Sequence, residues 1–172
     1  MKNFLVILMA AVCISIPVHA LDVDSLIATL RNDSGRPDAD KARDAGRKPA
    51  RVMDFIGIEE GMTVIDLVAA AGYYTEALSH AVGRSGKVYM QNSEMTGERG
   101  ARTAAAIDER LANNRLRNVE QLTASPDSLG LPDNSLDAAI IALEFHELYR
   151  SSNPNAVAEF LAAADILSGA FD

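Results

Sequence analysis

The chain has 172 residues, 48% of them hydrophobic, and a formal net charge of −8 at pH 7. This length suits one domain with a single sizeable core. The acidic balance disfavours binding of nucleic acid, because that affinity rests on lysine and arginine neutralising phosphates.

The first 20 residues have the pattern of a secretory signal peptide. Lys2 precedes an apolar run over residues 4–16, and small residues precede the expected cleavage point after Ala20. The apolar run is shorter than the roughly 20 residues of a spanning helix, and no later stretch qualifies. We therefore expect an exported protein, periplasmic or secreted, with no membrane span.

Cleavage also limits the chemistry available to the mature chain. It would remove Cys13, the single cysteine, and leave His80 and His146 as the remaining histidines. Disulfides, thiol nucleophiles and cysteine- or histidine-rich metal sites are thereby excluded, and no metal is predicted.

Residues 21–57 are predicted to form an N-terminal helical segment, with helices over 21–30, 38–47 and 49–56. The run 38–47, DADKARDAGR, contains mainly small and charged residues, which is typical of a solvated face. In the third helix, Val52, Phe55 and Ile56 are spaced as a core stripe.

Strands and helices alternate from residue 58 to residue 172, the predicted α/β domain. Strands are predicted over 62–66, 87–92, 118–123 and 136–143, and helices over 73–82, 96–114 and 155–167. Ala104, Ile107 and Leu111 are expected on the inner face of the 96–114 helix. The alternation predicts a parallel sheet with right-handed crossovers.

The stretch from Met62 to Thr75 is the predicted centre of this domain. Asp66 ends the first strand, Gly72 closes a tract of small residues, and a helix begins at Tyr73. Ligands of open α/β sheets bind at such strand ends, where small side chains let backbone approach. Asp66 either accepts hydrogen bonds from a ligand or caps the following helix, and the spacing favours neither interpretation.

Further motifs accompany this stretch: Arg36-Pro37, ADKARD at 39–44, RKP at 47–49, GMTVIDL at 61–67, GYYTE at 72–76, GKVY at 86–89 and LPDNSLD at 131–137. Together they resemble the class I, S-adenosylmethionine-dependent methyltransferases, and more narrowly a group of exported bacterial predicted methyltransferases. The resemblance covers nearly the whole mature chain. It implies a Rossmann-like three-layer αβα sandwich, S-adenosylmethionine as cofactor and methyl transfer to a small-molecule substrate.

The resemblance also implies cofactor-binding positions on the first strand and loop. It places Asp66, Ala70 and Gly72 against the methionine part of the cofactor. The family usually has glycines in this loop, where this chain has Ala69, Ala70 and Ala71. Each added methyl projects where backbone normally approaches the ligand, and alanine resists positive φ.

The remaining implied positions follow the second and third strands. Asn92 occupies the place where an acidic residue commonly accepts from both ribose hydroxyls, and Glu94 is its potential substitute. An amide oxygen is the weaker, neutral acceptor. Ser125 falls where an aspartate often meets the adenine amine, with Asp127 nearby as its replacement.

His146 is the candidate catalytic residue. It follows the fourth strand in EFHELY, residues 144–149, where it is placed to act as a general base for a substrate hydroxyl or amine. Glu144 or Glu147 would then orient its ring. The alternative is a surface or helix-capping histidine, and His80 is predicted to be structural.

The resembled fold continues with a fifth strand and usually a β-hairpin, whereas the predicted domain ends soon after the helix that follows the fourth strand. We therefore expect a C-terminally incomplete domain, with Ile140, Ile141 and Leu143 at or beside an open sheet edge that favours self-association. A degenerate, non-catalytic or small-molecule-binding protein is the alternative function. A nicotinamide-dependent oxidoreductase is disfavoured, because no G-x-G-x-x-G follows the first strand.

Overall fold

The computed structural model describes residues 21–126, 128–146, 149, 155 and 157–158. The predicted signal peptide, and all but three residues of the predicted 155–167 helix, lie outside these residues. Within the described part of the chain, no helix is both long enough and apolar enough to cross a membrane.

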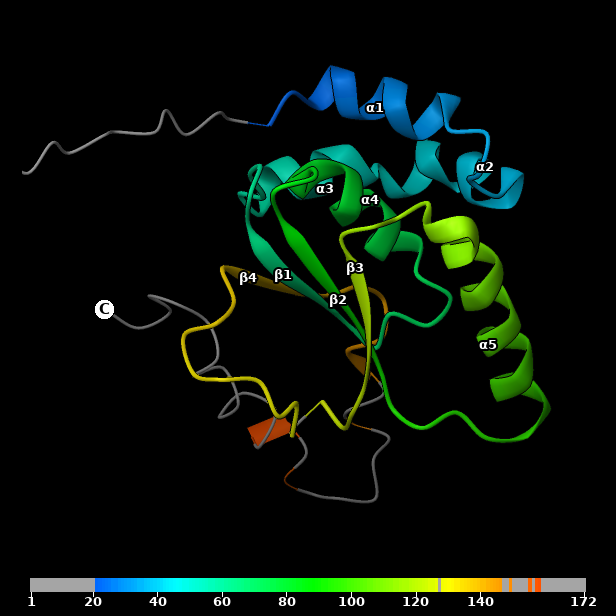
Figure 1. The fold of residues 1–172 in the computed structure, drawn as a ribbon, viewed down its shortest axis with the longest axis vertical. Helices are drawn as coiled ribbons and strands as arrows, with labels where there is room; N and C mark the ends of the chain where they lie inside the picture. The colour runs from blue at the N-terminus through cyan, green and yellow to red at the C-terminus, as the bar shows by residue number, and fades with distance from the viewer. Residues whose placement is uncertain (1–20, 127, 147–148, 150–154, 156, 159–172) are drawn as a thin grey trace, which may run out of the picture.

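Four parallel strands form the central sheet, in the order β3-β2-β1-β4 (Figure 1). They are β1 (Thr63–Leu67), β2 (Lys87–Asn92), β3 (Val119–Thr123) and β4 (Ala138–Ile141). The chain moves outward from β1 to β3 and then returns to the other side of β1. The strand order therefore reverses between β1 and β4, which is where open α/β sheets bind ligands. The predicted Rossmann-like parallel sheet is confirmed.

Five α-helices are described: α1 (Val23–Asn32), α2 (Asp38–Arg47), α3 (Pro49–Phe55), α4 (Tyr73–Val82) and α5 (Gly97–Leu111). A short 3₁₀ turn, Ala112–Asn114, follows α5. Helix α4 packs on β1 and β2, while α1 and α3 pack on α4 (Figure 1). The α1 helix begins where the Asp22 side chain accepts a 2.9 Å hydrogen bond from the Ser25 N–H.

The sheet separates two apolar clusters. On one face Val64 and Val88 pack with residues of α1, α3 and α4. On the other face Ile65 and Leu67 pack with Leu129 and Leu136. Successive strand residues thus point to opposite faces, as the pleat requires. Among the described residues, this second face of the sheet is covered by the 124–137 segment, which contains no helix.

The predicted core stripe of the third helix is right at Val52, which packs against the main core, and wrong at Phe55 and Ile56. Phe55 is 89% exposed and Ile56 37% exposed, while Pro49, Ala50 and Met53 are buried. The face that α3 turns to α1 and α4 therefore carries Ala50 and Met53, and Phe55 falls outside it.

Two helices bury charge where the sequence predicted otherwise. In α5 Ala104 is exposed, whereas Arg110 is buried beside Ile107. In α2 Asp40 is only 5% exposed, so this helix is not simply a solvated face. The two errors have one cause, because Arg110 and Asp40 form an ion pair.

The fourth strand is shorter than the predicted 136–143. Leu136 precedes it and is buried in the second cluster, while Leu143 follows it with φ of 69° and 62% exposure. Among the described strands, β4 pairs with β1 alone and so forms one edge of the sheet.

Candidate functional site

The loop between β1 and α4 has three residues with positive φ at alternate positions. They are Val68 at 53°, Ala70 at 49° and Gly72 at 83°. For residues other than glycine this conformation costs roughly 1–2 kcal/mol, and a β-branched side chain such as that of Val68 suits it least. The backbone strain predicted from the sequence is therefore confirmed at Ala70 and wrong at Ala69 and Ala71. The strain at Val68 was not predicted.

Two residues at the end of β2 hold this loop. The buried Gln91 side chain accepts a 2.8 Å hydrogen bond from the Val68 N–H. The backbone carbonyl of Gln91 accepts one of 2.9 Å from the Ala69 N–H. The Asn92 oxygen accepts from the Ala70 N–H at 2.8 Å, and its amide donates to the Ala70 carbonyl at 3.2 Å. These bonds offset the backbone strain. They also direct Asn92 to the loop.

Arg110 holds the last part of the loop. Its Nε donates to the Ala71 carbonyl at 2.6 Å, and its guanidinium pairs with Asp40 at 2.5 Å and with Glu76. A Cβ at Gly72 would lie 2.7 Å from the Met90 Cε and 3.1 Å from the Arg110 Cδ. The positive φ therefore favours glycine at residue 72, and a side chain there would also have to displace the end of the Met90 side chain.

A cavity of about 190 Å³ opens where the strand order reverses. The ends of β1 and β4, the β1–α4 loop, and α2 surround it. Its lining comprises Asp40, Arg43, Arg47, Asp66, Val68, Ala69, Ala70, Ala71, Tyr73, Tyr74, Arg110, Ala142, Leu143 and Glu144. The mixture of carboxylates, guanidiniums and aromatic rings suits a small zwitterionic or cationic group.

Asp66 is 2% exposed and accepts a 2.6 Å hydrogen bond from the Thr75 hydroxyl in the first turn of α4. Burial raises the pKa of Asp66 to about 7, against the opposing effects of the Thr75 hydrogen bonds and the Arg110 charge. Asp66 thus bonds to the first turn of α4, as the helix-capping interpretation expects, and it also lines the cavity, where acceptance of a ligand's hydrogen bonds stays a prediction.

Tyr73 connects the cavity to α2. Its hydroxyl donates to Asp44 at 2.7 Å, and the guanidinium carbons of Arg47 and Arg36 lie 4.6 and 5.3 Å from its ring centroid. Burial and the Asp44 carboxylate raise the pKa of Tyr73. Burial would raise the pKa of Asp44, but hydrogen bonds from Arg36 and Tyr73 lower it overall.

The structure brings together only some of the predicted site residues. Asp66 and Ala70 line the cavity, Gly72 closes its loop, and Asn92 bonds to Ala70. Three others are exposed and lie outside the cavity lining, namely Glu94, Ser125 and His146. Asp127 lies outside the described residues.

Sequence reasoning missed Asp40, Arg43, Arg47, Tyr73, Tyr74 and Arg110 as cavity residues. One signal for the first three was present. They recur at three- and four-residue spacing in α2, so they share a helical face. For Arg110 no local signal exists, because its partners lie 34 to 70 residues away in sequence.

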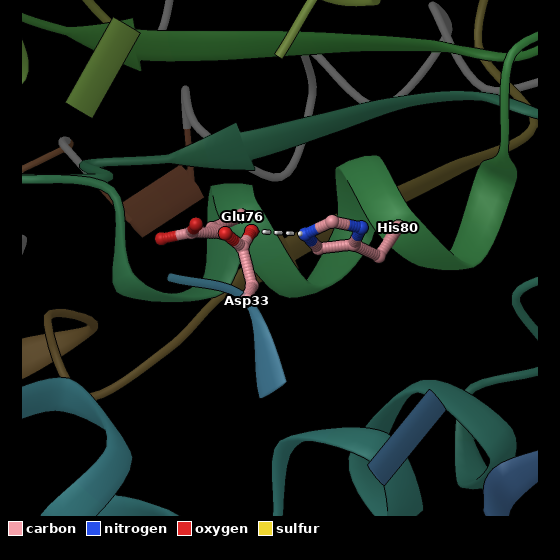
Figure 2. A group of neighbouring side chains, drawn as sticks. All are labelled: Asp33, Glu76 and His80. Carbon is pink, nitrogen blue, oxygen red and sulfur yellow. Dashed lines mark hydrogen bonds and ion pairs between the residues drawn. The ribbon is translucent and has the colours of Figure 1, made fainter. Parts of the chain in front are cut away.

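A separate cluster joins Asp33, Glu76 and His80 (Figure 2). Glu76 and His80 come from α4, and the His80 Nε2 lies 3.2 Å from an Asp33 oxygen. Arg115 already pairs with both carboxylates, at 2.7 Å for Asp33. A guanidinium thus supplies the positive charge that a metal ion would bring, and the cluster links α1 to α4.

Comparison with known proteins agrees with this geometry. Residues 44–152 match the ubiE/COQ5 methyltransferase family. The chain belongs to this family. Among curated relatives, the ubiquinone/menaquinone biosynthesis C-methyltransferase UbiE of Escherichia coli O1:K1 / APEC is 32% identical over 91 residues, which cover 52% of this chain and 34% of that protein. The chain thus spans about a third of the length of the curated relatives that it matches.

Solved structures show the same fold. A SAM-dependent methyltransferase from Aquifex aeolicus is 31% identical, with a TM-score of 0.58, covering 86% of this chain and 68% of that one. A cyclopropane-fatty-acyl-phospholipid synthase-like protein from Lactobacillus casei has the same TM-score at 21% identity, and the match covers 84% of this chain and 54% of that one. The fold of this family member is therefore that of the class I methyltransferases.

Proposed function

We propose that this chain binds S-adenosylmethionine, with its amino-acid end in the cavity beside β1, and transfers the methyl group to a small molecule. The observation that carries this proposal is the placement of Asp66 and Arg47 in one cavity where the strand order reverses. A carboxylate and a guanidinium suit the ammonium and carboxylate groups of the ligand. Membership in a methyltransferase family supports the same ligand.

The cavity residues fit the amino-acid end of the cofactor. Arg47 stacks on Tyr73 and forms no ion pair with any described residue, so its charge is available to a carboxylate. Asp66 accepts hydrogen bonds from the Thr75 hydroxyl and backbone, and we propose that its carboxylate also accepts from the ammonium group. For the ribose, Asn92 is engaged with Ala70, so we propose the exposed Glu94 as the acceptor.

The cofactor would supply a methyl group activated by its sulfonium. The protein's part is then mainly alignment, because this transfer needs a correctly oriented nucleophile more than an elaborate catalytic set. His146 follows the cavity residue Glu144 by two positions, and we propose it as the base for a substrate hydroxyl or amine.

Calorimetry of the full chain with S-adenosylmethionine and S-adenosylhomocysteine tests the proposal. We expect saturable binding of both ligands to one site. The absence of heat at millimolar ligand would contradict the proposal.

A degenerate, non-catalytic member of the fold is the second candidate. Two observations favour it, namely the engagement of Asn92 with the loop and the positive φ of Val68 and Ala70. Restoring glycine at Ala70 separates the two candidates. If the wild type binds S-adenosylmethionine, Ala70→Gly should change the affinity only modestly. If the site is degenerate, the wild type should not bind and Ala70→Gly should bind measurably.

Export is part of the proposal. The signal-like sequence of residues 1–20 supports it, with cleavage after Ala20. Mass spectrometry of the protein recovered from a periplasmic extract should find a chain that begins at Leu21. Recovery of the uncleaved chain in the cytoplasm alone would contradict export.

A further inference from the structure

A second cavity lies between α1, α2 and the start of α3, with a volume of about 340 Å³. Its α2 side presents Lys41, Asp44 and Ala45, whereas the cavity beside β1 uses Asp40 and Arg43 of the same helix. The two cavities share no lining residue, so α2 is a wall between them. Small-molecule sites typically occupy roughly 300–1,000 Å³, and this volume falls within that range.

The floor of the second cavity is apolar. It is made by Ile27 and Leu30 of α1 and by Pro49 and Ala50 of α3. Leu30 and Ala50 are each 1% exposed and belong to the main core, so the floor is firmly packed. Such a surface favours an apolar group over water.

The rim of the same cavity is basic. Arg31, Lys41, Lys48 and Arg51 line it, and Asp44 is its single acidic residue. The charge of Asp44 is already matched by Arg36, through hydrogen bonds of 2.5 and 2.8 Å.

The rim cations are poorly neutralised. Arg31, Lys48 and Arg51 pair with no carboxylate among the described residues, and Lys41 lies 3.9 Å from Asp38. This concentration of positive charge stands out in a chain with a formal charge of −8. An anion is the complementary ligand.

We propose that this cavity binds an amphipathic anion, a single negatively charged head group on a short apolar chain. The apolar chain would lie on the floor of Ile27, Leu30, Pro49 and Ala50, and the head group would lie among the rim cations. Lysine and arginine stems pack along apolar surface while their charged ends reach water, which suits this arrangement. The inference is independent of methyl transfer.

Calorimetric titration of the full chain with octanoate tests this site, with octylammonium as the charge-reversed probe. We expect octanoate to bind and octylammonium not to bind. S-adenosylhomocysteine should not compete, because no lining residue is shared. No binding of octanoate, equal binding of octylammonium, or competition by S-adenosylhomocysteine would overturn the proposal.

Matched variants locate the binding. The double change Arg31→Gln and Arg51→Gln should weaken octanoate binding by about five- to tenfold, as expected for two partly solvated charges. Arg84→Gln with Arg102→Gln removes two exposed arginines elsewhere and should leave the affinity unchanged. Equal affinity of the two double variants would overturn the proposal.

A cavity-filling variant supplies the second readout. Ala45 is exposed on α2 and lines the cavity, so Ala45→Phe should abolish octanoate binding without unfolding the protein, as checked by circular dichroism. Retained binding would overturn the proposal. Concentration-dependent association of the wild type that Ala45→Phe abolishes would instead assign the cavity to a second copy of this chain, and would also overturn it.

Discussion

At the scale of single residues, Asp66 is both a buried residue and a cavity residue. It lies in the core at the end of β1, and it faces the cavity proposed for the cofactor's ammonium group. Burial raises the pKa of its carboxyl from 3.8 to about 7. A group with a higher pKa in the folded state keeps its proton longer when folded. The free energy of unfolding should therefore fall as the pH rises between these two values.

Asp66→Asn should remove this pH dependence. Relative to the variant, the wild type should lose about 2 kcal/mol of unfolding free energy between pH 5 and pH 7, because each unit of pKa shift corresponds to about 1.4 kcal/mol. Thermal unfolding of both proteins at several pH values measures the difference. Parallel curves over this range would show that the Asp66 carboxyl is already ionised at pH 5.

The strained loop gives a second prediction at this scale. Ala70→Gly should raise the free energy of unfolding by up to about 1 kcal/mol, because glycine adopts the positive φ without strain. Ala71→Gly is the matched control one residue on, where φ is not positive, and it should lower stability by about 0.5–1 kcal/mol. Chemical denaturation measures both changes. Equal destabilisation would mean that Ala70 is not strained.

The sequence predicted the place of a site residue when that place depends on neighbouring residues in the chain. It did not predict the contacts of residues whose partners lie far away in the sequence. Asp66 and Gly72 stand out because a strand, a small-residue tract and a helix follow one another. The engagement of Asn92 with Ala70 depends on how a loop 22 residues away folds back. Val68 was missed because strain was assigned to the alanine tract, whereas the backbone alternates every second residue.

At the scale of elements, buried charges join α2, α4 and α5. Arg110 of α5 pairs with Asp40 of α2 and with Glu76 of α4, and it holds the Ala71 carbonyl of the cavity loop. Arg115, after α5, also pairs with Glu76. Burying a carboxylate is costly unless its charge is matched. The position of the cavity loop therefore depends on α5.

Arg110→Met should destabilise the protein by about 3–5 kcal/mol, because it leaves the Asp40 and Glu76 carboxylates buried with less positive charge. Arg102→Met, on an exposed part of the same helix, should change stability by less than about 0.5 kcal/mol. Urea denaturation compares the two variants. Similar effects of both would mean that the buried network is not a net source of stability.

The types of the helices and strands were predicted well, but the faces that the helices bury were not. All four strands and the five described helices occur close to the expected residues, because hydrophobic periodicity and glycine or proline boundaries are local signals. The buried face of α3 and the buried arginine of α5 depend on the neighbouring helices. Periodicity alone ranks Phe55 as a core residue, whereas α3 contacts its neighbours through Ala50 and Met53.

At the scale of the whole molecule, β4 is an edge of the described sheet, and Leu143 beside it is 62% exposed. An open edge with an apolar neighbour favours association. We expect the chain to self-associate at high concentration and Leu143→Lys to reduce this tendency. Arg102→Lys is the conservative surface control. Size-exclusion chromatography with light scattering over a range of concentrations measures both, and a monomeric wild type throughout would contradict the expectation.

The proposed function depends on a cofactor site where the strand order reverses between β1 and β4. The most direct test is the calorimetric affinity of S-adenosylhomocysteine for the wild type, for Arg47→Glu in the cavity and for Arg102→Glu on the surface. We expect the wild type to bind. Arg47→Glu should lose at least about tenfold in affinity, because a carboxylate would then face the ligand carboxylate, and Arg102→Glu should change it little. No binding by the wild type at millimolar ligand, or equal affinity of Arg47→Glu and the wild type, would contradict the proposed function.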